Sequence, residues 1–164
     1  MSRQILDSSN RAGDVDPAVA DRPAWMATLA KAAPADLERA WAALDPPPAF
    51  TRLRPAETGL VMVRGRISGS GRPFNLGEMT MTRAAIRLDD GPTGFGHVMG
   101  RNTRHAELAA LFDALLQDPA RHDGLIARVI APLAAHTTAE RQRKAAEVAA
   151  TKVDFFTLVR GEDR

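Results

Sequence analysis

Arginines that recur along two predicted strands are the side chains of this chain best suited to binding chemistry. Arg64 and Arg66 lie two residues apart, and Arg83 and Arg87 lie four apart. Because successive side chains on a strand point to opposite faces, each pair shares one face. A guanidinium binds a phosphate or a carboxylate through planar, bidentate hydrogen bonds. The spacing predicts a positive sheet face that binds an anion or an acidic partner, with a solvated outer face as the alternative.

A second candidate anion site is the segment 94–102, GFGHVMGRN, where a predicted strand leads into a helix. Backbone N–H groups at a helix N-terminus attract anions, and Arg101 and Arg104 lie beside this one. His105 follows in the same helix, close to an apolar stripe that includes Leu108. It is the one candidate catalytic residue, as a general acid or base, and its alternative is a buried, hydrogen-bonded core histidine.

Other motifs exclude several classes of site. Ser68–Gly71 (SGSG) forms either an anion-binding nest or a plain hairpin turn, and it matches neither nucleotide-binding glycine motif. The chain has no cysteine, which excludes disulfides, thiolate metal sites and a cysteine nucleophile. We expect no metal site, because the four histidines follow no ligand spacing. They are His97, His105, His122 and His136.

Three segments read as strands: residues 60–67, 78–88 and 93–99. Glycine-containing turns at 68–71 and 89–92 separate them, and these turns are too short for a crossover helix. We therefore expect an antiparallel β-meander of about three to four strands, packed with N-terminal and C-terminal helices. The predicted fold class is α+β.

Capping residues and prolines mark the expected helix boundaries: Asp21, Pro34, Asn102, Pro119, Pro132 and Thr137 or Thr138. The run Asp45–Pro48 ends the second helix. The last helix, AERQRKAAEVAATK, has few apolar residues, so we expect it to lie on the surface or to pack on a partner. A disordered tail is expected over residues 1–20 and a single domain over 21–164.

Charge is concentrated in the middle of the chain. The formal net charge is +2, but residues 52–104 contain nine arginines and four acids. No apolar run approaches the ~18 residues of a membrane span, and the N-terminus has no signal-peptide core, so we expect a cytoplasmic protein. A stand-alone nucleic-acid binder is the weakest alternative, because the chain has three lysines and no interleaved aromatic residues.

Five collinear segments carry a more specific signal: Arg54–Val61, Thr82–Leu88, Gly100–Glu107, Ile130–Leu133 and Val153–Gly161. In their order they resemble the G subunit of the phosphonate carbon–phosphorus lyase system. The resemblance runs from about Arg22 to the end of the chain and leaves out the polar N-terminus.

The resemblance implies a cytosolic core complex with H, I and J subunits, two copies of each, and an ATPase-like L subunit. It implies that the complex transfers an alkylphosphonate to C1′ of the ribose of MgATP, with release of adenine. The product is α-D-ribose 1-methylphosphonate 5-triphosphate. The resemblance assigns the nucleosidase-like chemistry to the I subunit and the iron–sulfur chemistry to the J subunit. It transfers no catalytic residue and no bound cofactor to this chain.

Two interpretations follow from the residues and the resemblance together. In the first, the chain is a non-catalytic subunit of this complex, and its arginines with Phe155, Phe156 and Arg160 contact partner chains. In the second, the chain contributes to the active site by binding the triphosphate directly. The sequence does not decide which arginines contact ligand and which contact protein.

Overall fold

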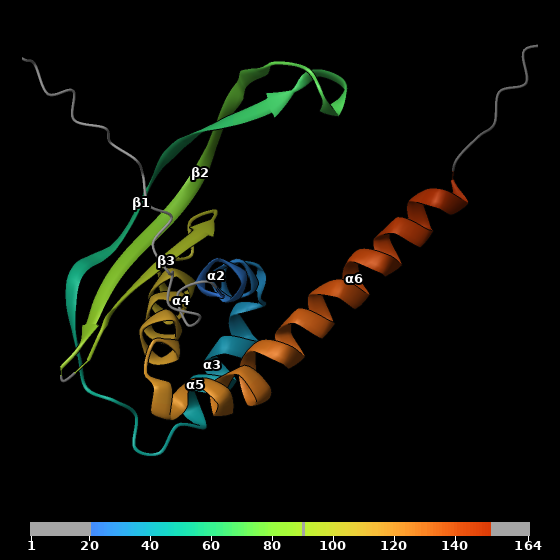
Figure 1. The fold of residues 1–164 in the computed structure, drawn as a ribbon. Helices are drawn as coiled ribbons and strands as arrows, with labels where there is room; N and C mark the ends of the chain where they lie inside the picture. The colour runs from blue at the N-terminus through green and yellow to red at the C-terminus, as the bar shows by residue number, and fades with distance from the viewer. Residues whose placement is uncertain (1–20, 90, 152–164) are drawn as a thin grey trace, which may run out of the picture.

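A computed structural model describes residues 21–89 and 91–151 of the chain (Figure 1). Its elements follow in chain order: α2 (Arg22–Lys31), α3 (Pro34–Ala42), β1 (Phe50–Arg66), a 3₁₀ turn η1 (Ile67–Gly69), β2 (Pro73–Leu88), β3 (Thr93–Met99), α4 (Thr103–Leu116), α5 (Pro119–Leu125), a π-helical turn η2 (Ile126–Ile130) and α6 (Ala131–Ala150). The α+β class is confirmed. The predicted tail at 1–20 and the predicted contact residues Phe155, Phe156 and Arg160 lie outside the described residues.

The three strands form an antiparallel sheet in the order β1-β2-β3, which confirms the predicted meander. β3 has the predicted bounds, but β1 begins at Phe50, ten residues before the predicted start, and β2 begins at Pro73. The missed part of β1 contains Pro55 and two register shifts, between Arg52 and Arg54 and between Arg54 and Glu57. Bulges of this kind interrupt the two-residue alternation on which strand prediction depends.

The core lies between one face of the sheet and helix α4. Figure 1 shows α4 lying along the sheet, with α2 beside it. Gly94 and Gly96 of β3 let the helix come this close. A Cβ atom at either position would lie 2.0 Å from a backbone oxygen of α4, that of Ala110 or of Ala106. The contact between strand and helix backbones therefore depends on these two glycines.

Side chains of α4 also cover the outer edge of β3. The backbone N–H of Phe95 donates to Asp113 Oδ2 at 2.8 Å, and Gln117 Nε2 donates to the Thr93 carbonyl at 3.0 Å. An edge strand with free backbone groups invites pairing with another chain, so these bonds close that edge. In the described part of the chain, no strand pairs with the outer edge of β1.

The predicted break at Pro132 is wrong. α5, the π-helical turn η2 and α6 follow one another with no residue between them, and their junction residues Ile126 and Ala131 have helical dihedral angles. Pro132 is the second residue of α6 and follows the π-helical turn η2 directly, where the regular α-helical hydrogen-bond ladder is already interrupted. α6 then extends away from the sheet and the other helices (Figure 1), and its residues beyond Thr137 are exposed, as predicted for a helix of low apolar content. No described helix combines the length and hydrophobicity that crossing a membrane requires.

Candidate functional site

Arg83, one of the predicted anion-binding residues, is held by a carboxylate of its own chain. Glu57 lies opposite it in the β1–β2 register, and Arg83 Nε donates to Glu57 Oε1 at 2.8 Å. Arg54 Nη1 donates to the same oxygen at 3.1 Å. All three side chains are at least half exposed. This part of the sheet is thus an exposed cluster in which two arginines share one carboxylate, with a net charge of +1.

Arg104 belongs to a second network, which connects α3, α4 and β1. Its guanidinium donates to both carboxylate oxygens of Glu38, at 2.8 and 3.0 Å, and approaches Glu107 at 3.5 Å. Arg52 holds Glu107 in turn, with distances of 2.7 and 3.2 Å. The hydrogen bond with Glu38 raises the pKa of Arg104, and the bond with Glu107 does the same for the pKa of Arg52. The same contact with Arg104 holds the pKa of Glu38 below its ordinary value of 4.5.

The remaining predicted arginines lie in three separate places. Within the described residues, Arg64, Arg87 and Arg101 are exposed and have no carboxylate partner, while Arg66 donates to the Gly71 carbonyl at 3.1 Å. Arg87 pairs with Thr51, thirteen positions along β1 from Arg64, which separates the two arginines by about 40 Å at the usual rise per strand residue.

The two arginine pairs also lie on opposite faces of the sheet. Arg64 lies six residues after Thr58 on β1, so the two side chains share a face of the sheet. Thr58 Oγ1 is 3.0 Å from Oγ1 of the buried Thr82, which places this face on the α4 side. Arg83 is the next residue after Thr82 and therefore faces the other way. The structure does not bring the predicted arginines together into one anion site.

His105 lies in the core. Its side chain is buried, and its Nε2 is 2.9 Å from the Leu29 carbonyl oxygen of α2. Because a carbonyl can only accept, Nε2 must carry the proton in this contact. The predicted cap is also present, since the His105 backbone N–H donates to Asn102 Oδ1 at 2.9 Å. The ring therefore connects α2 to α4, which corresponds to the core-histidine alternative.

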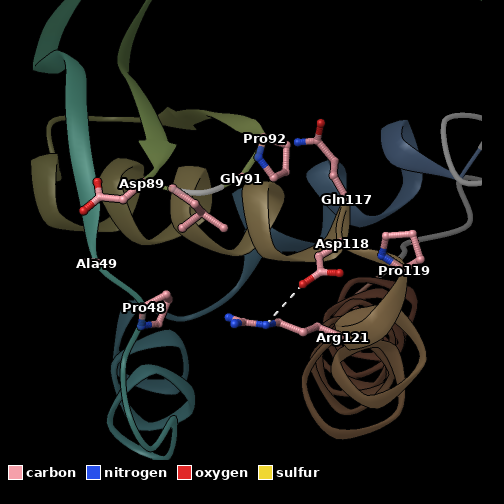
Figure 2. Close-up of a pocket in the computed structure, with 10 residues that line it drawn as sticks. Pro48, Ala49, Asp89, Gly91, Pro92, Gln117, Asp118, Pro119 and Arg121 are labelled. Atoms are coloured by element: carbon pink, nitrogen blue, oxygen red, sulfur yellow. Dashed lines mark ion pairs between the residues drawn. The ribbon is translucent and has the colours of Figure 1, made fainter.

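A cavity of about 490 Å³, which was not predicted from the sequence, lies where three loops meet. Figure 2 shows the Arg121 side chain directed toward Asp118, with which it forms an ion pair at 3.2 Å; Gln117 and Asp89 also line the cavity. None of the predicted site residues lines this cavity. Its one arginine is occupied by Asp118, so we assign no chemistry to it.

A projecting hairpin is the surface that stands out most clearly. We define the hairpin arm as residues 59–80: the end of β1, the turn η1 and the start of β2. Figure 1 shows it extending beyond α2 and α4. Five of its large apolar side chains are exposed, with relative accessibilities of 41–67%: Leu60, Met62, Ile67, Phe74 and Leu76. Sequence analysis located part of this strand pair, but the length of the arm depends on residues 73–77, which it left out of β2.

Comparisons with known proteins agree with one another. A family model described as "Phosphonate metabolism protein PhnG" matches residues 20–161. A curated protein of Rhizobium meliloti (strain 1021) is 50% identical over 159 residues, which cover 97% of this chain and 100% of the relative. It is named "Alpha-D-ribose 1-methylphosphonate 5-triphosphate synthase subunit PhnG". Both matches include the hairpin arm, the sheet and all described helices.

Proposed function

Since this chain belongs to the PhnG family of phosphonate metabolism proteins, we propose that it serves as the PhnG subunit of an α-D-ribose 1-methylphosphonate 5-triphosphate synthase. One observation carries this proposal: half of the residues are identical to those of a named synthase subunit along that protein's entire length. The match thus extends over the sheet, the helices and the arm and is not confined to one motif.

The proposed setting is a multi-subunit complex in the cytoplasm. There the chain would assemble with H, I and J subunits and an ATPase-like L subunit. The assembled enzyme would transfer an alkylphosphonate to C1′ of the ribose of MgATP and release adenine, with MgATP as a substrate of the complex. The chain itself would bind no cofactor.

Within this complex we propose a supporting role for the chain and not a catalytic one. The arginines best placed to receive a phosphate, Arg83 and Arg104, are held by Glu57 and Glu38. The histidine that could transfer a proton is buried and bonded to a backbone carbonyl. Arg64, Arg87 and Arg101 are exposed and have no carboxylate partner among the described residues, and of these Arg101 lies next to the N-terminus of α4. It keeps open the second candidate role, direct contact with the triphosphate.

Functional replacement tests the proposal. The chain is expressed in a Rhizobium meliloti strain that lacks its own PhnG subunit, and growth is measured with methylphosphonate as the sole phosphorus source. We expect growth to be restored, together with formation of the ribose 1-methylphosphonate 5-triphosphate product in extracts. A chain that accumulates to the level of the relative but restores neither growth nor product would overturn the proposal.

A further inference from the structure

The hairpin arm is attached to β3 only at its base, where the Gly100 backbone N–H donates to the Thr80 carbonyl at 2.9 Å. β3 pairs with β2 only from Met81 onward, so both edges of the arm lack a ladder partner in residues 21–89 and 91–151. Its exposed apolar side chains occupy both faces: Leu60 and Met62 on the face of Arg64, and Phe74 on the opposite face, with Gly65. A two-stranded ribbon with two apolar faces and two free edges is unstable in water unless something covers it.

Glycines on one face of the arm indicate what covers it. A Cβ atom at Gly59 or Gly77 would meet nothing within 4 Å, whereas one at Gly94 or Gly96 would collide with α4. Glycine in a strand interior weakens the strand and often marks a place where another backbone approaches closely. Nothing inside the described chain requires glycine at these two arm positions. Close approach of another chain's backbone would explain why both positions are glycine.

The charge of the arm identifies the kind of chain. The arm carries Arg64, Arg66 and Arg72 against Glu78, a net charge of +2. Neither Arg64 nor Arg72 has a carboxylate partner among the described residues. Two copies of the arm would therefore repel each other.

We propose that the hairpin arm inserts into a groove on a different, companion subunit of the synthase, a groove with apolar walls and carboxylates at its rim. This inference rests on the proposed function. The leucines and Phe74 fill the groove, Gly59 and Gly77 admit the partner's backbone, and Arg64 and Arg72 bind the rim carboxylates. Central apolar anchors surrounded by charged pairs are the usual arrangement of a stable interface between subunits.

Two arm variants test the proposal in the complex co-expressed with its companion subunits. Leu60→Ser combined with Leu76→Ser removes two anchors, and Gly77→Val fills the space left for the partner's backbone. Co-purification with the tagged chain and the dissociation constant of the assembled complex are measured. We expect each variant to bind at least about tenfold more weakly. The isolated Gly77→Val chain should keep or exceed the wild-type melting temperature, because valine favours strands.

A matched control separates the arm from general loss of surface hydrophobicity. Leu53→Ser changes another exposed leucine of β1, outside the arm, and should leave assembly unchanged. Arg64→Glu should weaken assembly, and raising the salt concentration should weaken the wild-type complex but have less effect on this variant.

The outcomes distinguish the inference from the proposed function. Wild-type assembly in both the double serine and the Gly77→Val variants would overturn the arm's role, even if the wild-type chain restores growth on methylphosphonate. Arm-dependent dimers of this chain alone would overturn it as well. Failure of the wild-type chain to restore growth would count against the proposed function instead.

Discussion

The Asp113 carboxylate accepts two hydrogen bonds from the side of the Arg22 guanidinium, at 3.0 Å from Nε and 2.7 Å from Nη2. Asp113 is fully buried, while a quarter of the Arg22 side chain is exposed. Trp25 Nε1 and the Phe95 backbone N–H donate to the same carboxylate at 2.9 and 2.8 Å. One acidic side chain thus joins α2, α4 and the outer edge of β3. A buried carboxylate is tolerated because its lone pairs are occupied by these donors.

Replacing Asp113 with alanine should destabilise the chain strongly. The change leaves the Arg22 charge partly buried without its partner and removes the acceptor for Trp25 and Phe95. Breaking a buried pair in this way costs about 3–5 kcal/mol of unfolding free energy. Urea unfolding followed by circular dichroism measures the loss. Asp113→Asn, which keeps one acceptor oxygen, should lose less, and a loss below about 1 kcal/mol for Asp113→Ala would show that the carboxylate does not connect these elements.

Alanine at Gly96 should prevent stable packing of α4 on the sheet. The added Cβ would lie 2.0 Å from the Ala106 backbone oxygen, and a backbone atom of a buried helix cannot move aside cheaply. We expect a cooperative unfolding transition that is shifted by at least about 3 kcal/mol or lost. Gly59→Ala is the matched control, because its Cβ would meet open space. Equal stability of the two variants would contradict the packing described for β3.

Several local signals in the sequence were read correctly, although the side chain of Asp21 makes no capping hydrogen bond to α2. Asn102 caps α4, Pro34 begins α3, and β3 spans Thr93–Met99, because caps, helix-starting prolines and short alternating strands act within a few residues. The start of β1 was missed, since Pro55 and two bulges hide its alternation. A bulge can be recognised only when the partner strand and its register are known.

Contacts between residues far apart in the chain could not be predicted from the sequence. Asp113 is a single acid within an apolar helix, and its donors come from residues 22, 25 and 95. From the sequence, Arg83 and Arg104 were predicted to be available to an anion. In the structure, the strand register places Glu57 against Arg83, and the helix packing places Glu38 against Arg104. Net charge along a segment therefore overstated how much positive charge is available to a ligand.

His105 should prove to be a positioning residue of the fold. Glutamine can present a nitrogen donor where the ring places Nε2, so His105→Gln should keep the bond to the Leu29 carbonyl, whereas His105→Ala leaves that buried carbonyl without a donor. We expect His105→Ala to lose about 1–3 kcal/mol of unfolding free energy and His105→Gln to lose less. In the assembled complex, His105→Gln should retain turnover with an unchanged pH profile. Turnover lost in both variants while assembly and stability are kept would instead indicate a catalytic histidine.

The ion pair between Glu38 and Arg104 should make stability depend on pH in the acid range. The hydrogen bond from Arg104, followed by its charge, holds the pKa of folded Glu38 below 4.5, although partial burial acts in the opposite direction. The unfolded chain therefore binds a proton at Glu38 at a higher pH than the folded chain does. The stabilisation is fully present above pH 4.5 and is lost as the pH falls through the folded value.

Carbon-13 NMR of the Glu38 carboxyl group checks this prediction directly, and we expect a titration midpoint below 4.5 that returns toward 4.5 in Arg104→Ala. The stability difference between the wild type and Glu38→Gln should shrink as the solution is acidified below that pH. Because both side chains are nearly half exposed, added salt should shrink it too. Glu140→Gln is the control, since Glu140 has no arginine partner among the described residues, and its effect should not change with salt. A Glu38 midpoint at or above 4.5 would mean that Arg104 does not hold this carboxylate in solution, and Arg104 would then be available to bind a phosphate.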